Sequence, residues 1–313
     1  MGNMPRRWKK RLILPVLVCA CLGGHANLFA ADKKDPDSHA GKAGHAMDLF
    51  HHGKYHEAEL EFRTLLTADE KSRGLDHADT LQDRKNLAIV LGVEGDYLGA
   101  EKVLREAIDL ESGILGAQNK DVIEFREILA STFAREGRNA EAVREFREIL
   151  ALRERIAGPD DLSVARARSN LGGALADGGQ FEEAEKFLRA AQPVLEKKLG
   201  PNDATVLLNR TNLCKPLLAL GRFAEAEKEQ RAVLATLQPV LGAAHPEVAL
   251  ASLTLAATLR AEKKFPEALD LARRAEARLA EVMGPDHPKV KEARELIHDI
   301  EAAAPPQKAP RAP

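Results

Sequence analysis

Residues 199–227, LGPNDATVLLNRTNLCKPLLALGRFAEAE, contain two glycines and an alanine that recur through the chain at one spacing. The first glycine series repeats every 42 residues: Gly74, Gly116, Gly158, Gly200, Gly242 and Gly284. The second keeps the same period, with Lys263 in the sixth place: Gly53, Gly95, Gly137, Gly179 and Gly221. The alanines are Ala58, Ala100, Ala142, Ala184, Ala226 and Ala268, and an arginine follows five residues after each. Four series in one register predict a repeat protein.

Each repeat is predicted to contain two helices. A capping position follows the first glycine, occupied in turn by His77, Asn119, Asp161, Asp203, His245 and His287. Side-chain oxygens of Asn and Asp accept an otherwise unpaired N–H at a helix start, and proline, present at 246 and 288, suits the first helical position. The second glycine ends the first helix because glycine adopts a left-handed conformation at little cost. The second helix then runs to the next repeat glycine, and the conserved spacing of alanine lets the two helices approach closely.

The predicted architecture is an all-α solenoid of about six helix-turn-helix repeats over residues 39–303. A single helix pair cannot bury its apolar faces, whereas stacked pairs can. Residues 287–303 form one further amphipathic helix, which we interpret as a terminal cap. Residues 32–38 are interpreted as a linker, and residues 304–313, APPQKAPRAP, as a disordered Pro-rich tail.

Residues 1–31 have the layout of a secretory signal peptide, with five basic residues, an apolar run from Leu12 to Leu22, and small residues before Asp32. Two alternatives rank below free secretion. Val18-Cys19-Ala20-Cys21 loosely resembles a lipobox, in which Cys21 would be lipidated. The run could also remain as an uncleaved anchor, although it is shorter than the roughly 20 residues that a membrane span needs. All three place the remaining chain outside the cytoplasm, as a periplasmic or secreted protein.

Composition and motifs exclude several classes of function. The formal net charge is −2, which offers no electrostatic footprint for nucleic acid. Only Cys214 lies outside the N-terminal apolar run, so neither a disulfide framework nor a CxxC zinc site is predicted, and Cys214 is expected to be a buried small residue. The sequence has no GxGxxG, Walker A, GxSxG or HExxH motif. We therefore expect no enzyme activity, cofactor or metal site, including at His51, His52 and His56.

The repeat resembles the tetratricopeptide repeat, in the 42-residue form found in kinesin light chains and many bacterial proteins. The matching stretches are Leu199-Gly200-Pro201-Asn202-Asp203, Met283-Gly284-Pro285-Asp286-His287-Pro288 and Gly221-Arg222-Phe223-Ala224-Glu225-Ala226-Glu227. The resemblance covers about residues 40–300. It implies a right-handed superhelix whose first helices line a concave groove for a peptide or a partner helix. The tryptophan usual near the start of such repeats is replaced here by Arg84, Arg126, Arg168, Arg210 and Ser252.

The resemblance also assigns two rows of groove positions. One row is Gln82, Glu124, Arg166, Leu208 and Leu250, and the other is Lys85, Glu127, Ser169, Thr211 and Leu253. The groove would be charged near Lys85 and apolar near Leu208, Leu250 and Leu253, which suits an amphipathic or extended segment better than a small metabolite. The alternative is that these leucines pack against neighbouring helices.

Two further series are candidate binding residues. Asn86, Asn170 and Asn212 form a partial ladder, and asparagines at this position of the resembling family bond the backbone of bound peptides, since an amide both donates and accepts. Alternatively, they tie the turns together. Arg84, Arg126, Arg168 and Arg210 could form a cationic stripe for an acidic ligand. The favoured alternative is structural, with each guanidinium paired to a helix glutamate such as Glu101, Glu185 or Glu227.

These features predict a non-catalytic protein- or peptide-binding scaffold in the cell envelope, with a protein or peptide as its partner. The alternative is a structural subunit that associates with itself. The oligomeric state is left open by the sequence, and membrane attachment is expected only through the N-terminal segment.

Overall fold

A computed structural model describes residues 35, 37–243, 245–285 and 287–304. The predicted signal segment 1–31, including Cys21, lies outside the described residues, as do most of the linker and residues 305–313 of the tail. The described residues form two compact units, which cover residues 35–179 and 180–304.

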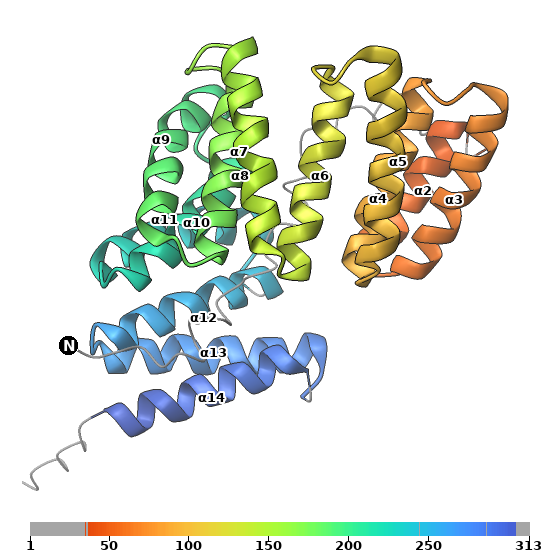
Figure 1. The fold of residues 1–313 in the computed structure, drawn as a ribbon. Coiled ribbons are helices and arrows are strands. Elements are labelled where there is room, and N and C mark those ends of the chain that lie inside the picture. Colours follow the sequence, from red (N-terminus) through yellow and green to blue (C-terminus); the bar gives the residue numbers. More distant parts are fainter. Residues whose placement is uncertain (1–34, 36, 244, 286, 305–313) are drawn as a thin grey trace, which may run out of the picture. The chain divides into compact units, whose positions relative to one another are not determined.

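Both units consist of antiparallel helix pairs (Figure 1). Residues 35–179 contain α2 His39–His51, α3 Tyr55–Ser72, α4 Ala78–Glu94, α5 Tyr97–Leu115, α6 Lys120–Glu136, α7 Asn139–Ile156 and α8 Leu162–Asp177. Residues 180–304 contain α9 Phe181–Leu199, α10 Ala204–Ala219, α11 Phe223–Leu241, α12 Pro246–Ala261, α13 Phe265–Met283 and α14 Pro288–Ala303. Within each unit every helix packs against the next one along the chain, and α4 also contacts α6. The predicted all-α class is confirmed, since the described part of the chain contains no strand.

The first residues of the helices follow the 42-residue repeat. The even-numbered helices from α4 onwards begin at residues 78, 120, 162, 204, 246 and 288. All six predicted capping residues are confirmed, because each side chain accepts a hydrogen bond from the backbone N–H two residues later. The distances run from 2.7 Å at Asp203 to 3.2 Å at the three histidines, which accept through Nδ1.

The second glycine series ends the even-numbered helices as predicted. Gly53, Gly95, Gly137, Gly179 and Gly221 all have positive φ angles, between 76° and 93°. Lys263 occupies the equivalent place and is the only non-glycine residue of the described ranges with a positive φ, at 63°. A side chain with a Cβ is strained there, because the left-handed conformation costs roughly 1–2 kcal/mol.

Replacing Lys263 with glycine is expected to raise the free energy of unfolding by about 0.5–1 kcal/mol. Relief of the left-handed strain outweighs the extra freedom that glycine gives the unfolded chain. Urea denaturation measures the change. The matched control is Gly221→Lys, which places the same side chain at the same position one repeat earlier and should lower stability. Unchanged stability in both variants would show that this turn relaxes around a side chain.

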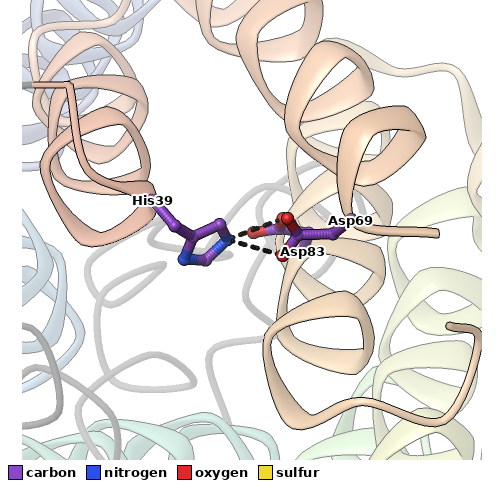
Figure 2. Close-up of side chains that lie close together, drawn as sticks. All are labelled: His39, Asp69 and Asp83. Carbon is purple, nitrogen blue, oxygen red and sulfur yellow. Dashed lines mark hydrogen bonds and ion pairs between the residues drawn. The ribbon is translucent and has the colours of Figure 1, made fainter. Parts of the chain in front are cut away.

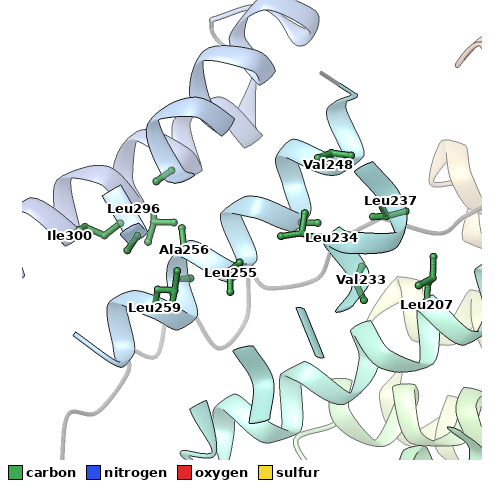
Figure 3. Packing of buried hydrophobic residues seen from close by; sticks show 14 residues of the cluster. Leu207, Val233, Leu234, Leu237, Val248, Leu255, Ala256, Leu259, Leu296 and Ile300 are labelled. Carbon is green, nitrogen blue, oxygen red and sulfur yellow. The ribbon is translucent and has the colours of Figure 1, made fainter. Parts of the chain in front are cut away.

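The core lies between the two helices of each pair. The six alanines of the repeat, from Ala58 to Ala268, are all fully buried, which confirms that they allow close helix packing. In the second unit, leucines of α10, α11 and α12 form one cluster with Leu296 and Ile300 of α14 (Figure 3). Helix α14 therefore covers the last pair, as expected for a terminal cap. Among the described helices, none combines the length and the apolar composition that a membrane crossing requires.

Candidate functional site

The predicted binding face of the first unit begins at the contact between α4 and α6. Lys85 of α4 is 5% exposed, and its Nζ donates to Asp121 Oδ1 at 2.7 Å and to Glu124 Oε2. The same ammonium lies 5.3 Å from the centroid of the Phe125 ring. These contacts join the two helices and neutralise Lys85, so its charge is already compensated within the protein.

The three predicted ladder asparagines differ in their surroundings. Asn86 of α4 is 2% exposed, and its Oδ1 accepts a hydrogen bond from Gln82 Nε2 at 2.9 Å. Its Nδ2 has no hydrogen-bond partner among the described residues. Asn170 of α8 is half-buried, and so is Asn212 of α10 in the second unit. Asn170 and Asn212 are thus partly open to solvent, whereas Asn86 is buried and bonded to Gln82.

Charge pairing continues along α6 and α8. Glu127 accepts a hydrogen bond from Arg153 Nε at 2.9 Å. Burial raises the pKa of Glu127, although the positive charges of Arg153 and Arg166 oppose this shift. Arg166 Nε and Ser169 Oγ are buried and lack a hydrogen-bond partner in the part of the chain that the structure describes. The described part of the polar face therefore contains paired charges together with a few groups that lack a hydrogen-bond partner, such as Ser169 Oγ and Arg166 Nε.

The predicted apolar positions lie in the second unit. Leu250 is buried with Leu279 and Val290, and Leu253 packs against the same cluster and against the larger core. Leu208 is half-buried on α10. Two of the three leucines thus contribute to packing within this unit, which limits the apolar area that they offer to a partner.

All four predicted stripe arginines are engaged with carboxylates. Arg84 donates to Glu70 Oε1 at 2.9 Å and to the Leu75 carbonyl at 3.1 Å. Arg168, two repeats later, has the same arrangement, with Glu154 at 2.9 Å and the Pro159 carbonyl at 3.0 Å. The two remaining members each bond two glutamates: Arg126 bonds Glu145 and Glu148, and Arg210 bonds Glu196 and Glu229.

The glutamates named as partners from sequence were wrong. Glu101 bonds Arg105 and Arg138, Glu185 bonds Arg189 and Arg222, and Glu227 bonds Arg231 and Lys264. The reason is geometric, since these acids reach the turn of the following repeat. The stripe arginines instead bond the second helices on either side of them: Arg84 and Arg168 reach back to the preceding helix and turn, Arg126 bonds the following helix α7, and Arg210 bonds both α9 and α11. Sequence reasoning also missed Arg294, which keeps the 42-residue register after Ser252 and bonds Glu276 and the Pro285 carbonyl.

A family model described as tetratricopeptide repeat matches residues 124–197 and 203–281. The chain contains tetratricopeptide repeats. This fold is a protein-binding scaffold that is generally non-catalytic. No curated protein sequence matches the chain significantly.

Several solved structures share the fold at low sequence identity. A putative kinesin light chain of Podosopora anserina is 21% identical, with a TM-score of 0.55, covering 66% of this chain and 98% of its own. BtubC (BKLC) of P. vanneervenii is 23% identical, with a TM-score of 0.57, covering 75% of this chain and 92% of its own. A Rap protein complexed with Competence and Sporulation Factor is 12% identical, with a TM-score of 0.58, covering 84% of this chain and 75% of its own.

Ion pairs also connect the second helices of successive tetratricopeptide repeats. Arg138 donates to Glu101, 37 residues earlier, and Lys264 donates in the same way to Glu227. Burial alone would raise the pKa of Glu227, but hydrogen bonds from Lys264 and Arg231 outweigh it and lower the pKa to about 2. Glu227 is therefore ionised at neutral pH and holds adjacent repeats together.

The tetratricopeptide repeats also carry an exposed apolar row that sequence reasoning missed. Four β-branched residues near the ends of second helices are 51–74% exposed: Ile114, Ile156, Val240 and Val282. They keep the 42-residue period, with Lys198 in the gap, so the register itself is the signal that would have found them. The first two lie in the first unit and the last two in the second.

Cys214 of the tetratricopeptide repeats lies on α10 and is buried, as predicted. Burial raises the pKa of its thiol, so the thiolate that a nucleophile needs does not form at neutral pH. This cysteine fills a core position.

Proposed function

We propose that this chain is a non-catalytic scaffold that binds an extended or amphipathic segment of another protein along its first helices. The observation that carries the proposal is the pairing of charges on the predicted binding face. Lys85 and the arginines Arg84, Arg126 and Arg168 are already neutralised by carboxylates. The groups left for a partner include neutral amides and hydroxyls, which match the N–H and C=O groups of a peptide backbone.

Two further observations support this choice. Asn86 Nδ2 and Ser169 Oγ are buried and have no hydrogen-bond partner among the described residues. Such atoms are uncommon in folded proteins, and a ligand that forms hydrogen bonds with them would explain them. A Rap protein with the same fold has been solved in complex with Competence and Sporulation Factor, so the fold accommodates a bound factor.

Replacing Asn86, Asn170 and Asn212 together with alanine is expected to weaken binding by about one to three powers of ten. Each lost hydrogen bond contributes roughly 0.5–1.5 kcal/mol. The partner would be captured from envelope extracts by affinity chromatography, and its dissociation constant measured by calorimetry against each variant.

The matched control is Asn202→Ala, which removes an exposed asparagine in a turn outside the first helices and should leave affinity unchanged. Circular dichroism checks that helicity is retained. Full affinity in the triple variant would refute the binding mode along the first helices. If Arg126→Met and Arg168→Met lower the affinity and make it independent of salt concentration, the cationic stripe is supported instead.

Self-association is a second candidate function, and exposed apolar residues in each unit favour it: Ile114 and Ile156 in the first unit, and Val240 and Val282 in the second. Exposed apolar residues in a regular series are typical of protein contact surfaces. Native mass spectrometry separates the candidates: a monomer favours the scaffold, and an oligomer that Ile156→Glu dissociates favours self-assembly.

We further propose that the protein is exported and works in the periplasm or outside the cell. The support is the sequence of residues 1–31, with its basic start and apolar run. Intact-mass analysis of natively expressed protein is expected to show a mature chain that begins after about residue 20. A chain beginning at lipidated Cys21 would select the lipoprotein alternative, and an intact cytoplasmic chain beginning at Met1 would contradict export.

A further inference from the structure

Three helices of the first unit direct one polar side chain each to a common point (Figure 2). His39 is the first residue of α2, Asp69 lies on α3 and Asp83 lies on α4. His39 Nε2 is 3.0 Å from Asp83 Oδ2 and 3.2 Å from Asp69 Oδ2. A single N–H at this nitrogen bonds only one of these oxygens well, and the bond goes to Asp83.

Both carboxylates are buried and incompletely satisfied. Asp83 is 0% exposed and Asp69 is 5% exposed. Asp69 Oδ2 and Asp83 Oδ1 have no hydrogen-bond partner within the described ranges. The single His39 side chain therefore does not compensate both carboxylates of this cluster.

The neighbouring charged groups leave the balance negative. Asp79 Oδ2 lies 3.8 Å from His39 Nδ1, and Arg73 bonds Asp79 while its Nε lies 3.4 Å from Asp69 Oδ1. Three carboxylates thus face one arginine and one histidine. A bound dication would offset this excess.

His39 and Asp83 depart from the core pattern of the repeat, and Asp69 departs from the leucine that the last three repeats hold. The places equivalent to His39 hold Leu81, Ile123, Ala165, Leu207 and Ala249, which are all buried, and then Lys291 in α14, which is exposed. The places equivalent to Asp83 hold Phe125, Ala167, Asn209, Ala251 and Ala293. The places equivalent to Asp69 hold Glu111, Arg153, Leu195, Leu237 and Leu279. Departures from a sequence's own core pattern that meet at one point in space are typical of a functional site.

The spacing of the three atoms fits a metal coordination sphere. Ligand atoms about 2.1 Å from a metal lie about 3.0 Å apart at a right angle and about 3.4 Å apart at the tetrahedral angle. The two distances from His39 Nε2 fall at 3.0 and 3.2 Å. The three ligand atoms all lie within 4.8 Å of one another, so they are gathered around one point.

We propose that His39, Asp69 and Asp83 form a binding site for one divalent transition-metal cation, which fastens α2 to α3 and α4. An imidazole nitrogen with two carboxylates suits Zn²⁺ or Mn²⁺, whereas Ca²⁺ and Mg²⁺ prefer oxygen ligands alone. The imidazole binds the metal through Nε2 after losing the proton that it now shares with Asp83. Asp83 precedes Lys85 and Asn86 on the same helix, but the site needs no peptide ligand.

The test is calorimetric titration of the chelator-treated, tag-free protein with ZnCl₂, repeated with MnCl₂. We expect one equivalent to bind and the thermal unfolding midpoint to rise with metal concentration. His39→Gln, Asp69→Asn and Asp83→Asn should each weaken binding at least tenfold. No binding of either metal, or equal affinity in these variants, would overturn the proposal.

The matched control is His56→Gln. His56 faces two carboxylates of the same unit, Glu59 and Glu94, at 3.5 and 4.0 Å, but it is exposed and Glu59 is already bonded to Arg63 at 2.7 Å. This variant should bind metal as the natural protein does. Loss of binding in His56→Gln with retention in His39→Gln would place the metal elsewhere and refute the assignment. If an aspartate variant does not fold, His39→Gln decides alone, since it leaves both buried carboxylates in place.

Discussion

Replacing Glu111 with leucine is expected to raise the free energy of unfolding by about 1–3 kcal/mol. Glu111 of α5 is fully buried, and neither carboxylate oxygen has a hydrogen-bond partner among the residues that the structure describes. Arg84 Nη1 lies 3.8 Å away, too far for a hydrogen bond. The equivalent position in α9, α11 and α13 holds leucine, so the change restores the repeat's own core residue.

The pH dependence of stability provides an independent readout of this change. Burial raises the pKa of Glu111 above its ordinary value, and the charge of Arg84 only partly opposes this. The folded state therefore holds the proton more tightly than the unfolded state, and stability falls as pH rises from the unfolded pKa through the folded one. Glu111→Leu should remove this loss. The matched control is Glu106→Leu on the exposed side of α5, expected within about 0.5 kcal/mol of the natural protein. Destabilisation by Glu111→Leu would show that Arg84 depends on this carboxylate.

Replacing Ala226 with leucine is expected to lower the free energy of unfolding by about 1–3 kcal/mol. Ala226 is fully buried in α11, with its carbonyl 4.0 Å from Cys214 Sγ of α10, so a larger side chain forces these two helices apart. Urea denaturation gives the size of the effect. Hydrogen exchange should show faster opening first in α10 and α11, because contacts in a repeat protein are between neighbours.

Ala224→Leu is the control for this overpacking, since Ala224 lies on the same helix but is exposed. It should leave both stability and exchange unchanged. A uniform acceleration of exchange through every helix in Ala226→Leu would contradict local damage and indicate one cooperative unfolding unit.

The fold was predictable because its signals are local. The left-handed glycines, such as Gly95, and the capping residues, such as Asp203, determine helix ends through bonds within a few residues. The core alanines follow from spacing along a single helix. These contacts depend on neighbours in sequence, so residues that recur every 42 positions produce helices that begin every 42 residues.

The side-chain partners were less predictable. The ion pair of Arg126 with Glu145 spans 19 residues and depends on the relative rotation of two helices, which sequence spacing alone does not give. His39, Asp69 and Asp83 lie on three helices, and none of the intervals between them suggests a metal motif. Comparison of each repeat position with its equivalents provides the missing signal, because His39, Asp69 and Asp83 are polar at positions where most later repeats hold apolar residues. That the asparagine ladder binds a peptide stays a prediction.

The constant interval between helix starts, from Ala78 to Pro288, has a genetic consequence. Recombination between two copies of the repeat at matching codons would delete or duplicate 42 residues in frame. The joined protein would keep each helix whole and each capping residue beside the helix that it caps. Such exchanges can lengthen or shorten the protein in single steps. An exchange that removed residues 39–80 would remove His39 and Asp69 and leave Asp83 as the single remaining member of the proposed metal site, so selection should act against loss of this first repeat more strongly than against loss of those that follow.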